Sequence, residues 1–168
     1  MANGNKWFEP CVIEISPLAD DLRVEMSASV YEALDAPSPT TIVRSDQTWY
    51  VKVYWNLTGK LAHHFCGTWC LCLLLESVGP GQEYGADNEG FCVDIKMDPC
   101  REEPYNYTFE IGPKQIETKR CGSLYLVGVT IVAFDPCDEP GHIAGYCKGP
   151  SVMVYPGKPN DEPEVTTV

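Results

Sequence analysis

The sequence has few basic residues: 12 lysines and arginines stand against 24 aspartates and glutamates, which gives a formal net charge of -12. Proteins that bind nucleic acids use clustered positive side chains to displace counterions from the phosphates, and this sequence has no such cluster. We therefore expect no nucleic-acid partner.

Long hydrophobic runs are missing as well. The longest, at residues 69–75, is far shorter than the roughly 20 apolar residues that a membrane-spanning helix needs, so we expect no insertion into a membrane. Residues 1–7 lack the apolar stretch of a secretory signal peptide. This favours either a cytoplasmic chain or the mature form of an exported one.

Motifs of the common enzyme classes are also absent. The sequence contains no nucleophile elbow, phosphate-binding loop, zinc-protease motif or dinucleotide fingerprint. A cysteine nucleophile assisted by His63, His64 or His142 is the remaining catalytic option, but nothing in the sequence brings such a pair together. We expect a protein that is not an enzyme and that carries no cofactor.

Cysteine, in contrast, is abundant, with nine residues in a chain of 168. Because the number is odd, at least one thiol is free or pairs with another chain. Disulfide bonds persist in oxidising compartments. The abundance therefore favours an extracellular or cell-surface location over the cytoplasmic alternative.

Apolar residues alternate with polar ones in many segments, which is the two-residue period of a half-buried β-strand. The clearest segments are residues 49–57, 91–97, 105–111 and 125–131, with shorter ones at 11–15, 142–147 and 151–155. Glycine and proline separate the segments where strands should reverse. The layout predicts an all-β fold of about eight or nine strands that resembles an immunoglobulin-like antiparallel β-sandwich.

One segment, residues 19–35, fits two periods. Leu22, Met26, Val30 and Leu34 recur at helical spacing, but Val24 belongs only to the alternating pattern. We predict a strand there. The sandwich should occupy residues 11–156, between an N-terminal extension at residues 1–10 and a tail rich in proline and acids at residues 157–168.

Two parts of the sequence follow the same plan. Cys66-Gly67 and Cys121-Gly122 each precede an apolar strand, and each part later reaches the tripeptide Asp-Pro-Cys, at residues 98–100 and 135–137. The plan indicates either two similar corners of one sandwich or an internal duplication.

The repeated plan supplies candidate disulfide bonds. Cys66 and Cys121 occupy comparable places, as do Cys100 and Cys137, so these are the first candidate pairs. Pairing of neighbours in the sequence, Cys92 with Cys100 and Cys137 with Cys147, is the alternative, because spacing does not determine connectivity.

The densest set of possible metal ligands consists of His63, His64, Cys66, Cys70 and Cys72. Zinc needs such thiolate and imidazole groups to converge tetrahedrally. On a strand that begins near residue 67, Cys70 and Cys72 point to the same face. A small zinc- or thiol-dependent protein is thus one alternative, and the other is that these two cysteines pack as small apolar residues.

Aromatic residues offer candidate binding surfaces. Tyr50 and Tyr54 lie opposite the apolar face of their strand, where the rings would stack on sugars, contact a neighbouring subunit or lie under the same chain. Trp7 and Phe8 are apolar residues in an otherwise polar segment. They are suited to anchoring the N-terminus on a sheet of the same chain or of a neighbouring chain.

These features favour a non-enzymatic structural or interaction module. We expect it to self-assemble as a homo-oligomer or to dock on another protein, through sheet edges and the terminal segments. The main alternative is a carbohydrate-binding β-sandwich, with a glycan as its ligand.

Overall fold

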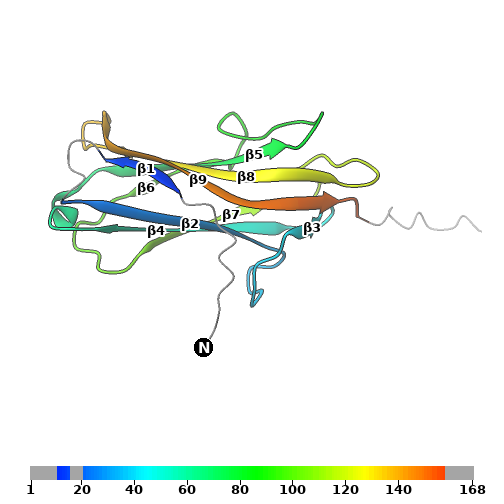
Figure 1. The fold of residues 1–168 in the computed structure, drawn as a ribbon, viewed down its shortest axis with the longest axis horizontal. Coiled ribbons are helices and arrows are strands. Elements are labelled where there is room, and N and C mark those ends of the chain that lie inside the picture. Colours follow the sequence, from blue (N-terminus) through cyan, green and yellow to red (C-terminus); the bar gives the residue numbers. More distant parts are fainter. Residues whose placement is uncertain (1–10, 16–20, 158–168) are drawn as a thin grey trace, which may run out of the picture.

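The computed structural model describes residues 11–15 and 21–157, which form a two-layer sandwich of β-sheets (Figure 1). The strands are β1 (Val12–Ile15), β2 (Arg23–Tyr31), β3 (Ile42–Arg44), β4 (Trp49–Thr58), β5 (Thr68–Ser77), β6 (Cys92–Lys96), β7 (Tyr105–Ile111), β8 (Ser123–Phe134) and β9 (Pro140–Tyr155). A single-turn 3-10 helix, η1 (Ala62–His64), lies between β4 and β5. The predicted all-β antiparallel sandwich is confirmed.

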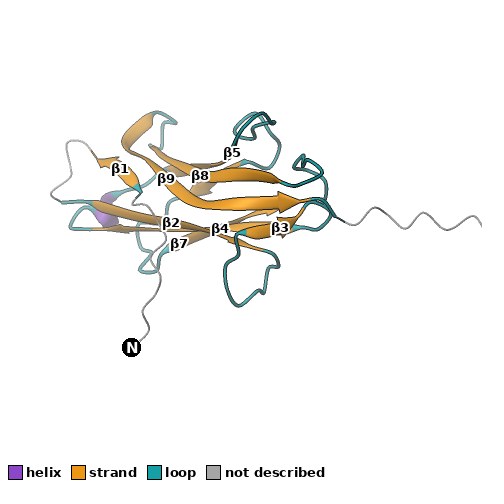
Figure 2. Ribbon diagram, turned by 45° about the vertical axis from the view of Figure 1, so that its right-hand side comes forward, coloured by secondary structure: helices purple, strands orange, loops and turns teal. Residues whose placement is uncertain are grey.

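The larger sheet has the order β1-β9-β8-β5-β6, and β3 joins it beside β9. The smaller sheet has the order β2-β4-β7. All pairings are antiparallel except that of β3 with β9, which is parallel. The two layers lie face to face in Figure 2.

Alternation along the strands places the core between the two sheets. In β4, Trp49, Val51, Val53 and Trp55 are buried, and the residues between them point outward. In β5, Trp69, Leu71, Leu73 and Leu75 are buried in the same manner. Because side chains on a strand point alternately to opposite faces, each apolar face meets that of the other sheet.

An aromatic cluster joins the two sheets. The Trp55 ring of β4 stacks on the Tyr105 ring of β7, with centroids 5.3 Å apart. The Trp69 ring of β5 meets both edge-on, at 6.5 Å from Trp55 and 6.1 Å from Tyr105. Aromatic pairs favour these offset and edge-to-face arrangements, so the cluster fixes the distance between the layers.

The ambiguous segment forms a strand over Arg23–Tyr31, which is β2, and bends and turns follow at residues 32–35. The two short pieces predicted at residues 142–147 and 151–155 belong to one strand, β9. Pro150 lies where the pairing with β8 shifts register between Leu126 and Gly128. A bulge tolerates a proline, which has no N–H to donate, so the strand continues through it.

The structure corrects the disulfide predictions. The bonds are Cys11–Cys147 and Cys72–Cys92. Cys72 lies directly opposite Cys92 in the register of β5 and β6. Cys11 precedes Val12, which lies opposite Tyr146, so Cys11 comes beside Cys147. The predicted partners of Cys92 and Cys147 were therefore wrong.

The remaining predicted pairs do not form either, because Cys66, Cys100, Cys121 and Cys137 are free, exposed thiols. Cys66 and Cys121 precede the starts of β5 and β8, two antiparallel strands whose starts lie at opposite ends of the sheet. Cys100 and Cys137 follow β6 and β8, which are separated by β5. Similar places in the sequence thus did not bring these cysteines into contact.

Candidate functional site

Three connections meet at the end of the sandwich that carries η1, drawn purple in Figure 2. They are the β4–β5 loop (residues 59–67), the β6–β7 loop (97–104) and the β8–β9 loop (135–139). We call this region the loop end. It holds five of the side chains singled out in the sequence: His63, His64, Cys66, Cys100 and Cys137.

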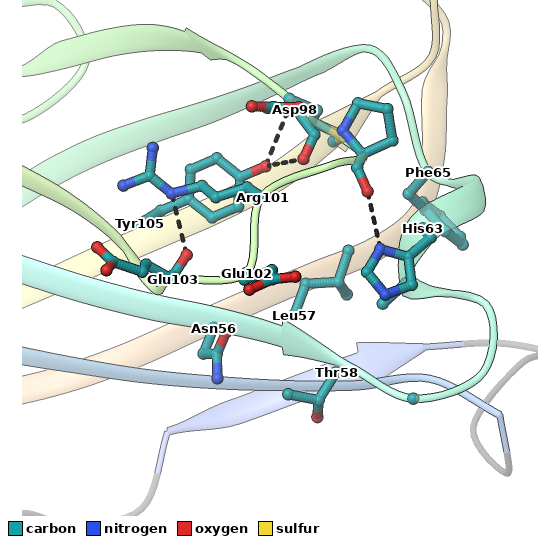
Figure 3. Close-up of a pocket in the computed structure, with 14 residues that line it drawn as sticks. Asn56, Leu57, Thr58, His63, Phe65, Asp98, Arg101, Glu102, Glu103 and Tyr105 are labelled. Atoms are coloured by element: carbon teal, nitrogen blue, oxygen red, sulfur yellow. Dashed lines mark hydrogen bonds between the residues drawn. The ribbon is translucent and has the colours of Figure 1, made fainter.

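A pocket of about 310 Å³ opens at the loop end, between the end of β4, η1 and the β6–β7 loop (Figure 3). Its walls carry polar and charged side chains from these elements. Sequence reasoning missed the pocket, although the run Arg101-Glu102-Glu103 after an Asp-Pro-Cys turn is a local sign of a charged loop.

Several polar groups of the pocket bind the chain itself. The Tyr105 hydroxyl donates to the Asp98 carbonyl oxygen (3.1 Å) and accepts from the Asp98 N–H (2.9 Å). His63 Nδ1 donates to the Pro99 carbonyl oxygen (2.9 Å). The Arg101 guanidinium lies 4.7 Å from the Tyr105 ring centroid and donates to the Glu103 carbonyl oxygen. These contacts hold the β6–β7 loop in shape.

The predicted metal-ligand set does not come together. Cys72 is bonded to Cys92, which removes its thiolate. Cys70 lies within β5 on the outer face, Cys66 lies in the preceding loop, and His63 is bound to the β6–β7 loop. Over residues 11–15 and 21–157, no group of three histidine, cysteine or acidic side chains is placed to hold a metal ion.

Cys70 is the partly buried free thiol of the chain. It lies directly opposite Asp94 of the neighbouring strand β6. Burial, together with the hydrogen bond and negative charge of Asp94, raises the pKa of the Cys70 thiol. The thiol therefore stays protonated at a pH where an exposed cysteine begins to ionise.

The two candidate tyrosines lie on the outer face of the smaller sheet, as predicted. Tyr54 is 46% exposed and Tyr50 is half-buried. Tyr31 of β2 lies directly opposite Tyr50, and the Lys52 ammonium lies 4.2 Å from the Tyr31 ring centroid. Three tyrosines and a lysine thus share one open sheet face. Trp7 and Phe8 lie outside the described residues.

The outer face of the larger sheet carries a feature that the sequence analysis missed. Ile42 of β3 lies opposite Met153 of β9, and Met153 lies opposite Leu124 of β8. Val78 donates its N–H to the Leu124 carbonyl oxygen (2.8 Å) and so extends the line. We call these four residues the apolar row; they are exposed by 55%, 38%, 40% and 53%, respectively.

Comparisons with protein-family models and with curated protein sequences found no match. Among solved structures, the chain is similar to a β-glucosidase from Listeria innocua in complex with glucose, at 12% identity and a TM-score of 0.45. The similarity covers 80% of this chain and 16% of the β-glucosidase chain. In the part of the chain that the structure describes, no helix has the length and apolar character needed to cross a membrane.

Proposed function

We propose that the protein is a non-enzymatic interaction module that associates with a second copy of itself through the outer face of the larger sheet. The observation that carries this proposal is the apolar row. Scattered apolar side chains are normal on protein surfaces, but a continuous line of them marks an interaction site.

The register explains why the row is continuous. Residues directly opposite each other on neighbouring strands point to the same face of a sheet. Ile42, Met153 and Leu124 therefore stand side by side across three strands. The Met153 side chain also packs over Gly122, where an added Cβ would lie 2.7 Å from its Cε. The Met153 side chain thus lies against the backbone of Gly122.

A second copy suits this row because both partners then present the same apolar line. A two-fold axis through the row matches apolar side chains with apolar side chains, and two-fold dimers are the commonest soluble oligomers. Sheets that pack face to face lie about 10 Å apart, with interdigitating side chains. Edge pairing and docking of the terminal segments remain predictions, and residues 1–10 and 158–168 lie outside the described part of the chain.

Sedimentation of the full chain, with its exposed thiols alkylated, tests the proposal. We expect a reversible dimer, and Leu124→Ser should weaken it about tenfold or more, because one substitution alters both halves of a two-fold interface. Leu34→Ser is the matched control, since Leu34 is 58% exposed but lies in the β2–β3 loop, away from the row. A monomer at every concentration, or equal weakening by both variants, would overturn the proposal.

Two further features are part of this proposal. An immunoglobulin-like relationship is supported by the packing of β2-β4-β7 against the four strands β9-β8-β5-β6. An extracellular location is supported by the two disulfide bonds, which persist in oxidising compartments.

A second candidate function, carbohydrate binding, rests on the tyrosines of the smaller sheet. Tyr50 and Tyr54 are four residues apart on the same face, about 13 Å along the strand, and Lys52 lies between them. Such rings can stack on sugar rings while the lysine donates hydrogen bonds. Binding to a glycan array that is lost in Tyr54→Ala would support this function, and the absence of binding by the native chain would exclude it for the glycans displayed.

A further inference from the structure

The loop end presents three free, exposed thiols, in the loops that adjoin three neighbouring strands. Cys66 precedes β5, Cys100 follows β6 and Cys137 follows β8. Since β5 is antiparallel to both neighbours, Thr68 at its start lies opposite Lys96 and Phe134 at their ends. The three cysteines therefore follow the strand order, with Cys66 between Cys100 and Cys137.

The two outer cysteines are held by turns of the same construction. The Cys100 N–H donates to Asp98 Oδ1 (2.9 Å), and the Cys137 N–H donates to Asp135 Oδ1 (2.8 Å). In each turn the next residue donates to the aspartate carbonyl oxygen, at 3.1 Å for Arg101 and 3.0 Å for Asp138. Each Asp-Pro-Cys turn thus uses its carboxylate to hold the backbone, and its cysteine remains exposed.

Cys66 is held between these two turns. The carbonyl oxygen of the next residue, Gly67, accepts the Met97 N–H (2.9 Å) from the β6 side. On the other side, a Cβ added to Gly67 would collide with the Phe134 carbonyl oxygen of β8. Cys66, Pro99 and Pro136 line one shared cavity. The start of β5 is therefore fixed relative to both turns.

Cys100 and Cys137 do not pair with each other within the chain. Their strands are separated by β5, which places the ends about 9.6 Å apart. A disulfide bond usually needs Cα atoms within about 6.8 Å of each other. Conditions that oxidise Cys11–Cys147 and Cys72–Cys92 also act on accessible thiols. Cys66, Cys100 and Cys137 are unpaired within the chain, so their exposed thiols are available to a second copy.

We propose that the loop end is a covalent self-association site, at which Cys66, Cys100 and Cys137 form disulfide bonds with the same three residues of a second copy. Cys100 and Cys137 lie in similar turns on opposite sides of Cys66. The row of three thiols can therefore face the same row of a second copy. A two-fold axis through Cys66 places it opposite Cys66 of the second copy. The same rotation places Cys100 of each copy opposite Cys137 of the other.

The bond forms through two exchange steps with a low-molecular-weight disulfide as oxidant. A cysteine thiolate of one copy attacks that disulfide, which yields a mixed disulfide and releases one small thiolate. A thiolate of the second copy then attacks the protein sulfur of the mixed disulfide, which joins the two copies and releases the second small thiolate. The two protein thiols lose two electrons and two protons, and the oxidant becomes two thiols.

The charge of the loop end adds a second expectation. Its three loops carry two basic residues, Lys60 and Arg101, against six acidic ones. Two copies therefore repel each other at low ionic strength, and salt screens this repulsion between exposed charges. Cross-linking should become faster as the salt concentration rises.

The test uses the full chain with both native disulfide bonds intact, incubated with oxidised glutathione and analysed by intact mass and peptide mapping. We expect a disulfide-linked dimer with Cys66–Cys66 and Cys100–Cys137 bonds between copies. The triple variant Cys66→Ser/Cys100→Ser/Cys137→Ser should lose the dimer. Cys121→Ser, which removes the exposed thiol at the opposite end, is the matched control and should keep it.

Four results would overturn the inference: glutathione adducts on a chain that stays monomeric, a bond from Cys66 to Cys100 or Cys137 within one chain, a dimer in the triple variant, or loss of the dimer in Cys121→Ser. The inference does not depend on the apolar row. Leu124→Ser should still form the cross-linked dimer, whereas the sedimentation test above uses alkylated thiols. Failure of one proposal is therefore distinguishable from failure of the other.

Discussion

At the scale of the residue, Cys70 illustrates how a neighbour on the next strand sets chemical reactivity. Alternation along β5 places it on the outer face, with Trp69 and Leu71 directed into the core. The register with β6 then puts Asp94 directly opposite. Partial burial, and then the hydrogen bond to the Asp94 carboxylate and its charge, favour the neutral thiol over the thiolate and raise the pKa of Cys70.

This environment predicts slow alkylation of Cys70. Because the thiolate is the reactive form, a raised pKa leaves less of it at any pH below that pKa. Asp94→Asn removes the negative charge, so the pH at which Cys70 labelling reaches half its maximum rate should fall. Asp94→Glu, which keeps the charge, is the control. Site-resolved mass spectrometry of labelled peptides measures the rates, and identical pH profiles for native chain and Asp94→Asn would contradict the prediction.

At the scale of the element, the start of β5 depends on a glycine. Gly67 has φ of 127°, a region that side-chain-bearing residues rarely adopt. A Cβ at this position would also collide with the Phe134 carbonyl oxygen of β8. The glycine therefore allows β5 to begin between β6 and β8, and it positions the loop end.

We expect Gly67→Ala to lower the free energy of unfolding by more than Gly79→Ala does. Gly79 has a similar φ of 104°, but no atom lies within 4 Å of an added Cβ. Gly79→Ala therefore measures only the free-energy cost of placing an alanine at a positive φ. That cost is about 1–3 kcal/mol, and Gly67→Ala should add the cost of the collision. Urea denaturation measures both variants, and equal losses would show that the contact with β8 is unimportant.

At the scale of the whole molecule, the two disulfide bonds act over different distances along the chain. Cys72–Cys92 joins residues 20 apart and closes the β5–β6 excursion. Cys11–Cys147 joins residues 136 apart and ties β1, near the N-terminus, to β9. A longer closed loop removes more conformational entropy from the unfolded chain.

The double variant Cys11→Ala/Cys147→Ala should therefore lose more stability than Cys72→Ala/Cys92→Ala. Chain entropy gives about 5 kcal/mol for the first bond and about 3 kcal/mol for the second. Free energies of unfolding from urea titration check the order. A larger loss in Cys72→Ala/Cys92→Ala would contradict the prediction. It would indicate residual structure in the unfolded chain, which makes the longer loop less costly to close.

Much of the fold could be predicted from the sequence because burial on a strand is a local pattern. The alternation at residues 49–57 correctly gave the buried and outward faces of β4. The short strand β3 was missed, since Ile42–Arg44 is too brief to show a period and it forms by pairing with β9. The candidate sites were harder to predict, because they depend on which strands become neighbours.

The sequence by itself determined the strands, their inward faces and the presence of a cysteine without an intrachain partner, because composition and two-residue periodicity need no knowledge of distant contacts. The tertiary structure alone decided which cysteines pair, that Cys66, Cys100 and Cys137 gather at one end, and that Ile42, Met153, Leu124 and Val78 form one row. Strand order and register set these outcomes, and both depend on contacts between residues far apart in the chain.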